Sequence, residues 1–319
     1  STGGAVNQVS KMPLHGTEAE VSTTLGSFNY RRITGDFNIS TADDAALRIT
    51  AMATKADSNG AGARLDKKGI AGAYRFGMGT NDEFLVALYA LQNDNGINYG
   101  MPWIRPTATA PGSALTINSN LSPNTYYGLA SDYNKGSANH LTASHTHRFD
   151  GESTLKTTIR AGQYTRDQRS GAIRFCQRTV NATTGVVSNP TCPTPLVALD
   201  TVNNATVLTR GNNNKVQDLD ATYAQSDYSN KFTALGLRHE VLAGVDWASE
   251  RKRVYSLSAV TKPTTTIGAV DDGAAVDEAS RTKTLASAFR SNSLGLYAQD
   301  LLQIAPAWKL LGGLRFDRM

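Results

Sequence analysis

The stretch Ala46-Leu47-Arg48-Ile49-Thr50-Ala51-Met52-Ala53-Thr54-Lys55 decides the fold, because its side chains alternate between two kinds. In an extended strand, every second side chain points to the same face of the sheet. The apolar face carries Leu47, Ile49, Ala51 and Ala53, and the other face carries Arg48, Thr50, Met52 and Thr54. The pattern therefore predicts a strand with one apolar and one largely polar face.

The same period of two returns along the rest of the chain. Similar faces consist of Leu155, Thr157, Ile159 and Ala161, of Val241, Ala243, Val245 and Trp247, and of Trp308, Leu310, Leu314 and Phe316. Eleven strands are predicted, near 17–28, 29–39, 46–55, 67–78, 83–92, 136–149, 153–166, 216–228, 237–252, 290–303 and 308–319. A soluble sandwich and a membrane barrel both show this alternation, so the connections must discriminate between them.

The predicted connections alternate between short polar turns and long irregular stretches. The turns lie at 40–44, 79–82, 150–152 and 305–307, and the long stretches lie at 56–66, 93–135, 167–215 and 253–289. Compact soluble domains rarely carry several such loops. Outer-membrane barrels combine short periplasmic turns with long extracellular loops. We therefore predict an all-β fold, an antiparallel transmembrane β-barrel.

Composition and motifs exclude several other classes of protein. Only 18% of the 319 residues are charged, and no apolar run approaches the roughly 18 residues of a membrane helix. The chain has no GxSxG, HExxH or GxxxxGK[ST] motif, so an enzyme is not predicted. The net charge of +5 resides mostly in one loop with few stacking aromatics, which disfavours nucleic-acid binding.

Two cysteines, Cys176 and Cys192, lie in a loop-like stretch without a CxxC motif or a nearby set of histidines. A zinc site is therefore not predicted there. A disulfide that closes this loop is favoured, and two free thiols remain the alternative.

The two ends of the chain carry a family resemblance. Gly3-Gly4-Ala5-Val6-Asn7-Gln8-Val9-Ser10-Lys11-Met12-Pro13 resembles the last stretch of the plug domain in TonB-dependent outer-membrane receptors. The segment 294–317 is similar to a mid-barrel hairpin of that family. Within the family, the stretches 96–102 and 127–133 resemble catecholate siderophore receptors of the Fiu type.

The resemblance implies two parts, with residues 1–13 as the C-terminal end of the plug and residues 14–319 as the N-terminal half of a barrel of roughly 22 strands. The odd number of strands and the chain end at Met319, within a patterned strand, also lead us to expect a truncated barrel. The joint between plug and barrel is expected at Gly3, Gly4, Asn7 and Lys11.

The resemblance further implies a receptor in the bacterial outer membrane that takes up a ferric siderophore actively. Energy would come from TonB acting on the plug, and no covalently bound cofactor is expected. Outer-membrane lipid and lipopolysaccharide are the expected surroundings, and phage or colicins are possible further partners. A catecholate siderophore is favoured, while a hydroxamate siderophore, haem and a passive porin-like channel remain open.

A ferric catecholate is a bulky anion with aromatic faces, so its site needs cations and flat side chains in the loops. The expected binding residues are Tyr99, Trp103, Arg105, Tyr126, Tyr127, Arg169, Arg174 and Arg178. The alternative is that these aromatic residues pack the loop or lie at the membrane interface.

A metal site is not predicted from the histidines. His145 and His147 share a strand face, but that face also carries Leu141 and Ala143, and ligation would require a lumen position and a third ligand.

Overall fold

The computed structural model describes residues 9–57, 62–122, 124–192 and 196–319. Eleven long strands form one sheet: β1 (Glu18–Gly26), β2 (Tyr30–Ala42), β3 (Ala45–Ala56), β4 (Leu65–Phe76), β5 (Asp82–Asn95), β6 (Tyr133–Arg148), β7 (Ser153–Arg169), β12 (Lys215–Ala234), β13 (Leu237–Leu257), β15 (Lys283–Ala305) and β16 (Trp308–Arg318). Five shorter strands lie in the loops: β8 (Gly171–Phe175), β9 (Thr179–Val180), β10 (Val187–Ser188), β11 (Val207–Asn212) and β14 (Thr265–Thr266). No helix in these ranges is long and apolar enough to cross a membrane.

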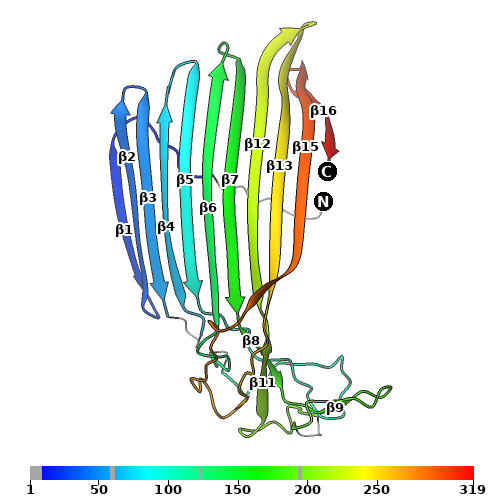
Figure 1. The fold of residues 1–319 in the computed structure, drawn as a ribbon. Coiled ribbons are helices and arrows are strands. Elements are labelled where there is room, and N and C mark those ends of the chain that lie inside the picture. Colours follow the sequence, from blue (N-terminus) through cyan, green and yellow to red (C-terminus); the bar gives the residue numbers. More distant parts are fainter. Residues whose placement is uncertain (1–8, 58–61, 123, 193–195) are drawn as a thin grey trace.

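The long strands follow one another in chain order, and each pairs antiparallel with the next. Figure 1 shows the short turns at one end of the sheet, and at the other the three longest connections, between β5 and β6, β7 and β12, and β13 and β15. The predicted all-β antiparallel architecture is therefore confirmed, and short and long connections alternate after β2. The connection between β1 and β2, at the same end as the long ones, consists only of residues 27–29.

Some strands continue beyond their predicted ends. β12 extends to Ala234 and β13 to Leu257, and β15 already begins at Lys283. The ladder between β13 and β15 continues here through pairs such as Arg253 with Ala288. Polar side chains at both faces hide the alternation in this region, although the backbone remains hydrogen-bonded. The long stretches are also less irregular than predicted, because β8, β11 and β14 form a small sheet within them.

One face of the large sheet carries the segment that precedes β1. Asn38 Nδ2 on β2 donates to the carbonyl oxygens of Leu14 (2.8 Å) and Gly16 (2.7 Å), and Arg75 Nη1 on β4 donates to that of Pro13 (3.1 Å). In Figure 1 this segment crosses behind the neighbouring strands. Because directly paired residues share a face, Asn38, Arg48 and Arg75 define an inner face of the sheet.

The opposite, outer face carries the apolar side chains of the sequence pattern. Ile49 on β3, Ile159 on β7 and Leu296 on β15 all belong to it and are exposed. An exposed apolar face over many neighbouring strands is the surface that a barrel presents to lipid. Register therefore places the apolar faces predicted from the sequence on the outside.

Candidate functional site

Three long connections pack together into a compact unit at one end of the sheet. We call the described residues of 96–132, 170–214 and 258–282 the loop cluster. Its small sheet has the strand order β14-β11-β8, and its apolar core consists of Tyr127, Ile173, Leu208 and Ile267. Tyr127 donates its hydroxyl to the carbonyl oxygen of Ile267 at 2.7 Å. The loops thus have a core of their own, so they can hold surface side chains in fixed positions.

A buried arginine joins all three loops of this cluster. The Arg210 side chain is fully buried, and its guanidinium donates to the carbonyl oxygen of Tyr127 (2.6 Å) and that of Pro263 (3.3 Å). It also pairs with the Asp272 carboxylate at 2.7 Å. Partial burial opposes ionisation of Asp272, but hydrogen bonds from Arg210, Ala274 and Thr265 outweigh burial and lower its pKa.

A second polar group fixes the base of the loop cluster on β7. The buried Asp132 carboxylate accepts the N–H groups of Gly171 (2.9 Å) and Leu129 (3.2 Å). Lys262 Nζ donates to the carbonyl oxygen of Ser170 at 3.0 Å. Burial raises the pKa of Asp132 and lowers the pKa of Lys262. The charges of Asp132 and Lys262 are costly to bury without hydrogen-bond partners. The arrangement of the loops that supplies these partners is therefore favoured over others.

The cysteines lie in the same cluster and form the predicted disulfide, Cys176–Cys192. This bond closes a segment that contains the two-stranded sheet of β9 and β10. The small hairpin is therefore tied covalently to the end of β8.

Five of the predicted ligand-binding residues make contacts that hold the loops. Tyr126 and Tyr127 are 4% and 2% exposed, so their rings have no face open to a ligand in this structure. Burial is the largest cause of a raised pKa at both hydroxyls. Arg105 donates to the carbonyl oxygen of Ala110 at 2.7 Å, and Arg169 pairs with Asp167 at 2.9 Å and with Glu278 at 3.6 Å. The hydroxyl of Tyr99 accepts a hydrogen bond from Gln168 Nε2 at 2.7 Å, although the residue remains exposed.

The other three predicted residues are available on the surface. Trp103 is 64% exposed, and Arg174 on β8 and Arg178 after it are also exposed. Arg174 and Arg178 belong to the segment held by the disulfide and the small sheet. Exposed indole and guanidinium groups are the types of side chain that can stack on or pair with an aromatic anion.

The predicted joint with the plug is only partly described. Gly3, Gly4 and Asn7 lie outside the described residues, whereas Lys11 pairs with Asp36 on β2. Arg48 on β3 binds the same carboxylate through two hydrogen bonds of 2.8 Å each, and also donates to the carbonyl oxygen of Met12 at 2.9 Å. Sequence reasoning missed Asn38, Arg48 and Arg75 as anchors for this segment. The pattern that could have revealed these anchors is a polar side chain on the same face of each of three neighbouring predicted strands.

At the short-turn end, three side chains of metal-ligating type lie together on the outer face: Asp82, His145 and His147. The sequence placed the two histidines on a shared face but gave no third ligand. Direct pairing of Asp82 with His147 supplies it.

Comparison with known proteins supports a single family. A family model described as "TonB dependent receptor-like, beta-barrel" matches residues 79–319. The chain is 27% identical to the catecholate siderophore receptor Fiu of Escherichia coli K12 over 98% of this chain and 40% of that protein. It is 31% identical to a probable TonB-dependent siderophore receptor, PiuA of Acinetobacter baumannii, over 40% of this chain and 17% of that protein.

A solved structure supports the same fold. The crystal structure of the E. coli ferric-catecholate import receptor Fiu in its closed form matches with a TM-score of 0.80 at 23% identity, over 98% of this chain and 42% of that one. The chain thus spans about two fifths of the length of the Fiu receptors that it matches.

Proposed function

Because this chain belongs to the TonB-dependent receptor-like β-barrel family, we propose that it is part of an outer-membrane receptor that takes up a ferric siderophore actively. The single observation that supports this proposal most is the match to the catecholate receptor Fiu along 98% of the chain. Members of this family are receptors and not enzymes. A ferric catecholate is therefore the first ligand to test.

We further propose that residues 1–13 end a plug domain and that residues 14–319 form the first half of a larger barrel. The contacts of Lys11, Arg48 and Asn38 support this division, because they hold the segment before β1 against the inner face of the sheet. TonB would act on the plug of the complete receptor. On this assignment the loop cluster is extracellular, and the short turns are periplasmic.

The proposed ligand surface consists of Tyr99, Trp103, Arg174 and Arg178 in the loop cluster. Their exposure and their attachment to a folded framework support this assignment. Arg105, Tyr126, Tyr127 and Arg169 would position that surface through the contacts described above. A preformed surface lowers the entropic cost of binding, which favours tight capture of a dilute ligand.

The test is a fluorescence titration of the complete receptor in detergent with ferric enterobactin, ferrichrome and haem. We expect ferric enterobactin to quench the tryptophan fluorescence at lower concentration than the other two ligands. In a variant with Arg174→Ala and Arg178→Ala, its affinity should fall at least about tenfold, which corresponds to about 1.4 kcal/mol. The matched control is Arg238→Ala, which removes an exposed arginine at the short-turn end.

Preference for ferrichrome or haem would contradict the catecholate assignment within the same receptor family. Equal affinity in the double variant and in the Arg238→Ala control would contradict the role of Arg174 and Arg178. Absence of binding by all three ligands would overturn the receptor proposal.

A further inference from the structure

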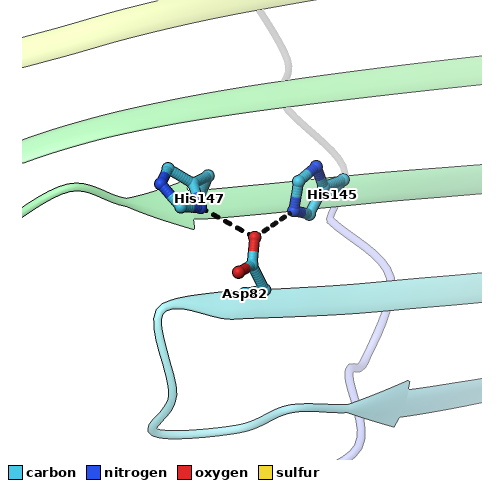
Figure 2. Close-up of side chains that lie close together, drawn as sticks. All are labelled: Asp82, His145 and His147. Atoms are coloured by element: carbon cyan, nitrogen blue, oxygen red, sulfur yellow. Dashed lines mark hydrogen bonds and ion pairs between the residues drawn. The ribbon is translucent and has the colours of Figure 1, made fainter.

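Three potential metal ligands converge on the outer face of the sheet, far from the loop cluster. Figure 2 shows the Asp82 carboxylate at the start of β5 between the imidazoles of His145 and His147 on β6. His145 Nε2 lies 2.8 Å and His147 Nδ1 lies 2.7 Å from the same oxygen, Asp82 Oδ1. All three potential ligand atoms lie within 4.8 Å of one another.

The strand register brings these side chains together. Asp82 pairs directly with His147, and His145 lies two residues earlier on the same face of β6. Neighbouring rings hold both imidazoles in place. Phe84 stacks on His145 with the ring centroids 4.4 Å apart, and Phe149 meets His147 edge-on at 4.5 Å. The ligand atoms are thus preorganised by two strands and two aromatic contacts.

The position of the cluster makes it accessible to ions from water. Asp82 directly follows the turn between β4 and β5, and His147 lies one residue before the end of β6. The same face carries a row of rings, with Phe76 stacked on Phe84 and Phe149 in contact with Tyr228. Such a band of rings is typical of the level where a barrel passes from lipid to water. The cluster therefore lies at the membrane boundary, and not in the lumen, where a metal site was considered from the sequence.

We propose that Asp82, His145 and His147 form a binding site for a divalent transition-metal ion of the zinc class. Two imidazole nitrogens and one carboxylate oxygen are a ligand set that Zn²⁺ accepts, with a fourth position open to water. Ligands of a tetrahedral zinc ion lie about 3.3 Å apart. The present separations from Asp82 Oδ1 need to widen by about half an ångström, and the two imidazole nitrogens, which lie within 4.8 Å of each other, need to reach the same spacing. Partly exposed side chains can provide both movements.

Metal binding requires a change of protonation at both imidazoles. An ionised carboxylate only accepts hydrogen bonds, so both imidazoles now donate their N–H to Asp82. When the metal binds, each ring gives up the proton of the nitrogen that faces Asp82, to its other nitrogen or to water, and offers the freed lone pair to the ion. The bound ion would link β5 to β6 at the periplasmic turns.

The test is Zn²⁺ binding to the complete receptor, without an affinity tag, in detergent and after removal of metals by chelation. We expect the wild type to bind one equivalent of Zn²⁺ more than each of the variants His145→Ala, His147→Ala and Asp82→Asn. The matched control is His239→Ala, because His239 pairs with Asp300 at 2.7 Å on the same outer face but belongs to no group of three such ligands among the described residues. This variant should retain the full stoichiometry.

A second readout does not depend on counting sites. Zn²⁺ should protect His145 and His147 from modification by diethyl pyrocarbonate, while the exposed His15 is modified as before. The mobility of unheated samples in electrophoresis shows whether the alanine variants fold. If they do not, the Asp82→Asn variant and the protection assay on the wild type still test the proposal. Equal Zn²⁺ stoichiometry in wild type and Asp82→Asn, or modification of His145 that is unaffected by Zn²⁺, would overturn the proposal.

Discussion

Asp132 is a buried carboxylate of the loop cluster whose hydrogen bonding is incomplete. Its side chain is buried, and only one of its two carboxylate oxygens has hydrogen-bond partners. Burial raises its pKa, while the N–H groups of Gly171 and Leu129 and the charge of Lys262 oppose the rise. Because the net pKa in the folded state is raised, the folded loops bind a proton more readily than the unfolded loops do.

The stability of the loop cluster should therefore depend on pH through this residue. The Asp132 contribution is most favourable below the ordinary carboxyl pKa of about 3.9 and declines as the pH rises through the raised pKa. Asp132→Asn should abolish this component. We expect the hydrogen-exchange protection of residues 126–133 to fall between pH 4 and pH 7 more steeply in the wild type than in the variant. Parallel pH profiles would show that Asp132 is not responsible.

The roles of single loop residues could be predicted only in part. The sequence shows that Arg169 and Arg210 are basic, but their partners Glu278 and Asp272 lie on another loop, 109 and 62 residues away. A count of charges therefore overestimates the positive charge that this loop offers to a ligand. Trp103, Arg174 and Arg178 remain exposed, and no property of the sequence alone separates them from Tyr126 and Tyr127.

Among the elements, the long strands were the most predictable. Lipid requires an apolar side chain at every second position, so β3, β7 and β16 could be located from alternation alone. The short elements in the loops were not predictable. β14 has only two residues, and its partner β11 lies more than fifty residues earlier. Such a strand exists because of tertiary packing and has no local pattern.

The disulfide should stabilise one element of the loop cluster and leave the barrel unchanged. Replacing both Cys176 and Cys192 with Ser should destabilise the segment between them by up to about 3 kcal/mol, as expected for a closed loop of this length. We expect faster proteolysis near β9 and β10, with the melting of the β-sheet signal in circular dichroism unaltered. A lower melting temperature of the whole barrel would contradict this local role.

At the scale of the whole molecule, the segment before β1 is attached to the barrel wall at several points. Asp36 and Arg48 are each less than one-sixth exposed, and they form one network with Lys11 and Met12. Asn38 and Arg75 continue this contact up to Gly16. The connection that leads into β1 therefore has its own anchors on the sheet.

Loss of Arg48 should release this segment without unfolding the barrel. Arg48→Met removes the hydrogen bonds to Asp36 and Met12, which we expect to cost about 2–3 kcal/mol locally. Hydrogen exchange of residues 11–16 should accelerate, while exchange in β2 and β3 should change little. Arg31→Met, at an exposed position of β2, is the matched control. Unchanged exchange in 11–16 would show that the remaining anchors suffice.

The contacts within the loop cluster also set an order of events during folding. The hydrogen bond from Tyr127 to Ile267 spans 140 residues, and the one from Val276 to Ser131 spans 145. Closing loops of that length in a free chain is slow, because the entropy is lost before any contact offsets it. The entropic cost of bringing the loops together becomes small only after the strands that carry them have paired. These strands are β6, β7, β12, β13 and β15. Assembly of the loop cluster, which carries the proposed ligand surface, is therefore a late step. It follows the pairing of the long strands.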